Sequence, residues 1–182
     1  QGLADYIDAP GFYAAGRLDT DRERLLLLTD HGGLQHRITD PGHKLPKTYW
    51  VQVEGVPTAE QLAHLAAGVD LGDFISLPAT VRMITAPGLW PRNPPIRERK
   101  SIPDSWLELT IREGKNRQVR RMTAKVGLPT LRLVRVKIGE WQLDGLLPGD
   151  MRRIQVAAPP APPQATVRRN VPRRPVARNG KR

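Results

Sequence analysis

Segments of strand length recur along this chain, separated by turn residues, and they outnumber the helical segments. Residues 48–54 alternate Tyr49, Val51 and Val53 with wetter side chains, which indicates a strand with one buried face. Further strands are expected at 25–29, 79–85, 105–113, 130–138 and 151–156. Because the strands occur in runs, the pattern predicts an α+β fold, with a mixed, mostly antiparallel sheet flanked by a few helices and long loops.

Helix signals are fewer. Residues 33–38 can form a helical stretch, and Thr58 with Gln61 forms a capping box that opens a helix to about Ala67. A third helix is expected after the turn at residues 113–115, with Asn116 as its N-cap.

The third helix has two kinds of face. At about 100° per residue, Val119 lies on an apolar face with Met122, whereas Arg117 and Arg121 share a basic face. Arg120 falls between these faces, where an arginine can reach inward at the rim of a core. We expect Arg117 and Arg121 to meet solvent or RNA.

Length and charge point to one globular domain followed by a basic tail. The 182 residues carry a net charge of +11, and seven of the 29 basic residues lie in 157–182, which has no acidic residue. We expect residues 1–156 to form the domain and the Pro/Arg-rich residues 157–182 to be disordered. The remaining 22 basic residues face 18 acidic ones, so the domain is only mildly basic overall.

The composition excludes several classes of protein. No apolar run approaches the roughly 18 residues of a spanning helix, so no membrane association is expected. The absence of cysteine excludes disulfides and thiolate metal sites and is typical of a cytoplasmic protein. The four histidines lack metal-ligand spacing, and we expect no metal site.

A proline-rich basic segment at 88–103 interrupts the pattern. It is too rich in proline for a regular element and too long for a simple turn. A long loop carrying Trp90 and several cations is suited to binding phosphates and stacking beside a base. The cations expected to contact RNA are Arg92, Arg97, Arg99 and Lys100.

Asp19 is the first candidate for chemistry. It follows Gly16-Arg17-Leu18 and leads into the apolar run at 25–29, in a strongly basic protein. Cations and desolvation would together control the charge state of such a carboxylate.

Three ordered motifs resemble those of the RsuA-type RNA pseudouridine synthases. They are residues 16–19 (GRLD), 47–49 (KTY) and 113–122 (EGKNRQVRRM), and the resemblance runs from about Gly11 to Val156. Within that family, residues 90–100 and 129–133 most resemble the subgroup E that acts on large-subunit ribosomal RNA.

The resemblance implies a role for each matched residue. Asp19 would be the catalytic carboxylate, acting as nucleophile or as base; Arg120 its charge partner; Tyr49 the ring that stacks on the extruded uracil; and Val119 part of the pocket lining. Core packing is an equally good interpretation of Val119. Arg17 and Lys47 would join the other cations that contact RNA.

The implied activity is conversion of one uridine of 23S ribosomal RNA to pseudouridine, without a cofactor. The partner would be 23S RNA or a large-subunit assembly intermediate, and the protein would be a monomer. The alternative is a non-catalytic RNA-binding module, acting in ribosome assembly or as an RNA chaperone on the same fold. It draws support from Arg22 and Arg24, which stand where the family has serine and glycine around a glutamate.

Two expectations concern domain content. The family's opening strand has no counterpart before Gly2, so the catalytic domain is expected to lack its N-terminal strand. No S4 RNA-binding domain is expected either, in agreement with subgroup E.

Overall fold

The computed structural model describes residues 8–16, 23–40, 42–43, 45–96 and 101–157. Asp19, Arg17, the three cations Arg97, Arg99 and Lys100, and residues 158–182 of the expected tail lie outside these ranges.

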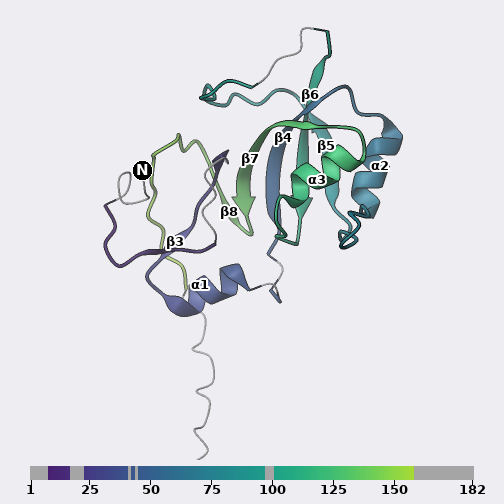
Figure 1. Ribbon diagram of the computed structural model, residues 1–182. Coiled ribbons are helices and arrows are strands. Elements are labelled where there is room, and N and C mark those ends of the chain that lie inside the picture. Colours follow the sequence, from purple (N-terminus) through teal and green to yellow (C-terminus); the bar gives the residue numbers. More distant parts are fainter. Residues whose placement is uncertain (1–7, 17–22, 41, 44, 97–100, 158–182) are drawn as a thin grey trace, which may run out of the picture.

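A mixed sheet forms the centre of the described fold (Figure 1). Its strands run in the order β2-β7-β4-β6-β5, and β8 also pairs with β7. The β2–β7 pair is parallel and every other pair is antiparallel, which confirms the predicted sheet type. The strands are β2 (Glu23–Arg24), β4 (Lys47–Glu54), β5 (Thr80–Ile84), β6 (Asp104–Ile111), β7 (Thr130–Ile138) and β8 (Trp141–Gln142).

Two helices cover one face of this sheet, α2 (Ala59–Ala67) and α3 (Gln118–Lys125) (Figure 1). Their apolar side chains join those of the strands in one buried cluster, which removes the sheet face from water. The cluster includes Val51, Val53, Leu65, Leu107, Leu109, Val119, Met122 and Leu133. In β4 the side chains of Val51 and Val53 are fully buried whereas Trp50, Gln52 and Glu54 are half-buried, as the alternation predicted; Tyr49, on the same face as the valines, is half-buried.

The predicted capping box of α2 is present. Thr58 Oγ1 accepts from the Gln61 amide at 3.2 Å, and Gln61 Oε1 accepts from the Thr58 amide at 2.9 Å. Gln61 Nε2 also donates to the Val126 carbonyl at 2.8 Å, so the start of α2 is tied to the end of α3.

A smaller layer lies beside the main sheet. The helix α1 (Gly32–Thr39) confirms the expected helical stretch, and it packs near the two-stranded sheet of β1 (Tyr13–Ala14) and β3 (Leu28–Thr29). Ala15, Ile38 and Ile138 form its buried centre.

The expected strand at 25–29 is corrected by the structure. The chain pairs with β7 through β2, where the Leu25 amide also donates to the Arg135 carbonyl at 2.7 Å, and then pairs with β1 through β3. The apolar run is therefore not one strand, because the chain changes pairing partner within it.

The expected strand at 151–156 is also wrong. These residues are exposed and form no strand. One edge of β7 is occupied by β4, and the other by β2 at Val134 and by β8 at Lys137 and Ile138, so pairing positions on β7 are already taken. Among the described helices, none has the length and apolar character needed to cross a membrane.

Leu107→Ala is expected to lower the free energy of unfolding by about 2–5 kcal/mol, because it opens a cavity in the fully buried cluster. Leu147→Ala is the matched control, since its side chain is 59% exposed and should change stability by less than about 0.5 kcal/mol. Urea denaturation measures both. Equal effects of the two changes would contradict this assignment of the core.

Candidate RNA-binding and catalytic site

The turn before α3 is built differently from the prediction. Arg117, not Asn116, occupies the N-cap position, with a left-handed φ of 50° and no capping side chain. The buried side chain of Gln118 closes the turn instead: its Oε1 accepts from the Lys115 amide at 3.2 Å and its Nε2 donates to Glu113 Oε2. The Asn116 cap is therefore wrong, because a buried side chain at the first helical position organises the turn.

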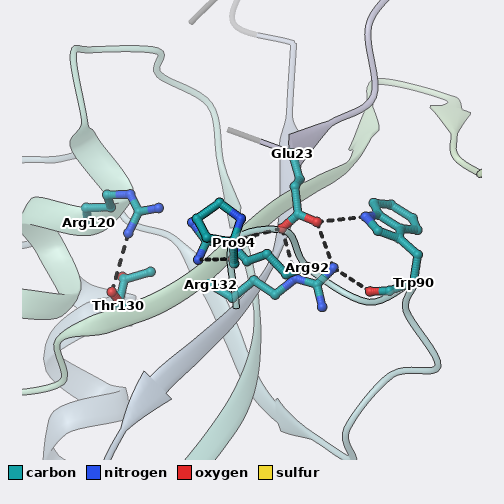
Figure 2. Close-up of polar contacts among 7 residues, drawn as sticks. All are labelled: Glu23, Trp90, Arg92, Pro94, Arg120, Thr130 and Arg132. Carbon is teal, nitrogen blue, oxygen red and sulfur yellow. Dashed lines mark hydrogen bonds and ion pairs between the residues drawn. The ribbon is translucent and has the colours of Figure 1, made fainter. Parts of the chain in front are cut away.

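Arg120 lies where α3 meets β7. Its side chain is half-buried, and its Nη1 donates to the Thr130 carbonyl at 3.3 Å (Figure 2). This placement at the rim of the core agrees with its position between the two helix faces. Its pairing with Asp19 stays a prediction, because Asp19 lies outside the described residues.

Tyr49 of β4 lines a small pocket. The other lining residues come from β2 and β7: Glu23, Arg24, Leu133 and Arg135. Tyr49 is half-buried, packs against the main core cluster and stands opposite Arg135 in the β4–β7 register. The pocket has a volume of about 10 Å³, too small for a base, but its lining places an aromatic ring beside two arginines and a carboxylate. An aromatic ring can stack on a base, and arginines attract phosphates.

Val119 lies in the core. It is 4% exposed and belongs to the main buried cluster, whereas the pocket that Tyr49 lines does not include it. Its role in lining a uracil site stays a prediction.

Positive charge is concentrated next to this pocket. The Lys47 ammonium donates to the Leu45 carbonyl at 3.0 Å, and burial, with a smaller contribution from Arg135, lowers the pKa of Lys47. The Arg135 guanidinium donates twice to the Leu25 carbonyl, at 2.8 and 3.2 Å. Arg135 was not singled out from the sequence, where it is one of three cations in the expected strand at 130–138.

A cluster of four side chains joins β2, β7 and the proline-rich loop (Figure 2). The Glu23 carboxylate accepts from Arg132 Nε at 2.8 Å and Nη2 at 2.7 Å, and from Trp90 Nε1 at 2.7 Å. Arg92 Nε lies 3.9 Å from the same carboxylate. We call Glu23, Trp90, Arg92 and Arg132 the Glu23 cluster; sequence reasoning noted Trp90 and Arg92 but missed Glu23 and Arg132.

The two basic-face residues of α3 differ in their surroundings. Arg117 is exposed. Arg121 forms an ion pair with Asp73, donates to the Leu71 carbonyl at 3.0 Å and lies over the Phe74 ring. The hydrogen bond with Asp73 raises the pKa of Arg121 and lowers that of Asp73. Arg121 is therefore held by protein groups on its face of the helix.

No three His, Asp or Glu side chains gather at a possible metal site within the part of the chain that the structure describes. The chemical groups assembled around the pocket are an aromatic ring, several cations and one carboxylate.

Comparison with known proteins places these features in a family. A family model described as RNA pseudouridylate synthase matches residues 6–125. A protein named ribosomal large subunit pseudouridine synthase E, from Xanthomonas axonopodis pv. citri (strain 306), is 66% identical over 147 residues, which cover 80% of this chain and 77% of that protein. The protein of the same name from Vibrio parahaemolyticus serotype O3:K6 is 55% identical over 85% of this chain and 65% of its own length.

A solved structure has the same fold. A crystal structure of a pseudouridylate synthase superposes with a TM-score of 0.68 at 33% identity, covering 83% of this chain and 60% of that one. The sequence comparison and the structural comparison thus both point to the family that the motifs at 16–19, 47–49 and 113–122 resemble. The chain belongs to the RNA pseudouridylate synthase family.

Proposed function

We propose that this chain converts uridine to pseudouridine in large-subunit ribosomal RNA, the 23S RNA of bacteria, with Asp19 as its catalytic carboxylate. The relatives that are 66% and 64% identical carry the name ribosomal large subunit pseudouridine synthase E, which supports the choice of substrate. We also propose the cytoplasm as its compartment, because ribosomal RNA is made and assembled there.

The observation that carries the proposal is that β7 contacts residues of two of the motifs and the strand that follows the third motif in the sequence. The strand that follows the GRLD motif pairs Glu23 with Val134, the strand of the KTY motif pairs Tyr49 with Arg135, and Arg120 of α3 donates to Thr130. One strand is therefore in contact with the strand that follows the GRLD motif, with the proposed stacking ring and with the proposed charge partner, which supports the proposal.

The proposed reaction rearranges bonds without loss of atoms. The bond between C1′ and N1 of uridine breaks, the base turns while it stays bound to the protein, C1′ bonds to C5, and the hydrogen of C5 is replaced by one on N1. Asp19 would act on the ribose, by adding to it or by removing a proton from it. Holding the detached base is the protein's main task, because recombination then stays intramolecular.

The remaining groups have proposed roles in this scheme. Tyr49 would stack on the extruded uracil and offset its lost stacking in the duplex or loop. Arg120 would favour the ionised form of Asp19, since a guanidinium next to a carboxylate lowers its pKa. Lys47, Arg92, Arg97, Arg99, Lys100, Arg17, Arg117 and Arg121 would contact phosphates, Arg121 while retaining its ion pair with Asp73.

Asp19→Asn should abolish pseudouridine formation, because the amide keeps the shape of the side chain and removes its nucleophilic and basic oxygen. Carbodiimide mapping of ribosomal RNA from cells that carry only the variant gene measures the result. Asp30→Asn, the same change at an exposed residue in the loop before α1, is the control and should leave the modification complete. If every pseudouridine persisted in the Asp19→Asn cells, the proposal would fall and a non-catalytic RNA-binding role would remain.

Arg117→Gln should weaken RNA binding and reduce the slope of log K against log salt concentration by about 1, as expected for one lost phosphate contact. Arg82→Gln provides the comparison, because Arg82 is exposed on β5 and pairs with Glu108 within the sheet. Filter binding of a large-subunit RNA fragment at several salt concentrations makes the measurement. An unchanged slope for Arg117→Gln would remove this residue from the interface.

A further inference from the structure

The proline-rich loop crosses the whole width of the main sheet. It leaves β5 after Ile84 and returns to β6 at Asp104, and these two strands are neighbours at one end of the strand order. Trp90 and Arg92 nevertheless reach Glu23 of β2, at the other end of that order. A connection between adjacent strands does not need this excursion, so the contact with Glu23 calls for its own explanation.

The contact is built as a fork around one carboxylate (Figure 2). Both Glu23 oxygens accept from the Arg132 guanidinium, and Oε1 also accepts from the Trp90 indole. Arg132 Nη2 donates in addition to the Trp90 carbonyl at 2.9 Å, and its guanidinium lies 5.8 Å from the centre of the Trp90 ring. The planar guanidinium thus fixes the carboxylate and the loop backbone in one geometry.

The fork is shielded from water. The Arg132 side chain is 9% exposed and that of Glu23 is 21% exposed. Shielding strengthens both the ion pair and its hydrogen bonds, and it penalises any change that leaves one charge without the other. The loop is therefore held more tightly than surface ion pairs would hold it.

Glu23 is also tied to the proposed active site. It follows Asp19 by four residues in the sequence, and its neighbour Arg24 lines the pocket together with Tyr49. Glu23 lies beside β7, because it pairs with Val134 in the parallel β2–β7 ladder. One side chain consequently connects the strand that follows the GRLD motif in the sequence with the loop that carries Trp90 and Arg92.

We propose that Glu23 is a positioning residue for RNA binding: its carboxylate, through Trp90 and Arg132, holds the loop at residues 85–96 beside the proposed active site. This inference rests on the proposed function, and it adds a determinant of substrate binding that takes no part in the bond rearrangement. Release of the loop should weaken RNA binding and leave the chemical step intact.

The sheet contains a matched control for this contact. Glu108 of β6 also accepts from a tryptophan indole, Trp50 Nε1 at 3.1 Å, and from an arginine, Arg82 Nε at 2.9 Å. All three residues of that trio belong to strands of the sheet, so Glu108→Gln makes the same chemical change as Glu23→Gln at a carboxylate whose Trp50 and Arg82 partners lie outside the loop.

The first experiment compares Glu23→Gln with Glu108→Gln on a large-subunit RNA fragment. For Glu23→Gln we expect KM and the Kd for RNA to rise at least fivefold and kcat to stay within twofold of the unsubstituted protein. For Glu108→Gln all three should stay within twofold. An unchanged Kd for Glu23→Gln, or equal rises in Kd for both variants, would overturn the proposal, as would a fall in kcat with unchanged KM.

The second experiment observes the loop directly. Trypsin cleaves after Arg92, and the cleavage rate, followed by mass spectrometry, should rise at least fivefold in Glu23→Gln and stay unchanged in Glu108→Gln. Trp90→Phe removes the indole donor, keeps an aromatic ring and leaves the Arg132 ion pair in place. Trp90→Phe should raise both the Kd for RNA and the cleavage rate, as Glu23→Gln does. If Glu23→Gln does not fold, Trp90→Phe decides whether the contact positions the loop.

The effects of Glu23→Gln and Trp90→Phe on the Kd for RNA should be less than additive in the double variant, because both substitutions break the same contact. Full additivity in Kd would contradict a shared role. If the unsubstituted protein formed no pseudouridine, the proposed function would be refuted. RNA binding and tryptic cleavage need no turnover, so these two measurements would still decide whether Glu23 positions the loop.

Discussion

The pairing of β7 with its neighbours is the constraint on which the arrangement of the site depends. Leu133 anchors the strand in the main core, β4 occupies one edge, and β2 and β8 share the other. Because side chains alternate along a strand, the register with β4 and β2 decides which residues meet at the pocket. A shift of one residue would turn Arg135 away from Tyr49 and Arg132 away from Glu23.

Charge is distributed unevenly around that strand. Arg24 and Arg135 line the pocket, and burial, with a smaller contribution from the Arg135 charge, lowers the pKa of Lys47. Such a concentration of cations favours an anionic ligand and opposes their further burial. The carboxylate of Glu23 forms ion pairs with Arg132 of β7 and with Arg92 of the proline-rich loop, so these charges also join the loop to the sheet.

Local patterns predicted much of the fold. Alternation located β4 to within a residue and the capping box located α2, since both signals depend on residues a few positions apart. The strands expected at 79–85, 105–113 and 130–138 match β5, β6 and β7 to within two residues. The errors arose where nonlocal contacts decide. The segment at 25–29 changes pairing partner, residues 151–156 are exposed and form no strand, and a buried Gln118 replaces Asn116 in closing the turn before α3.

The sequence by itself indicated the family and the candidate residues Asp19, Tyr49 and Arg120, because the order and spacing of short motifs are visible without coordinates. Only the tertiary structure decided that Arg135 faces Tyr49 in the register and that Glu23 binds Arg132 and Trp90. The physical reason is separation along the chain: Glu23 and Arg132 lie 109 residues apart, and no local pattern records a contact that sheet pairing creates.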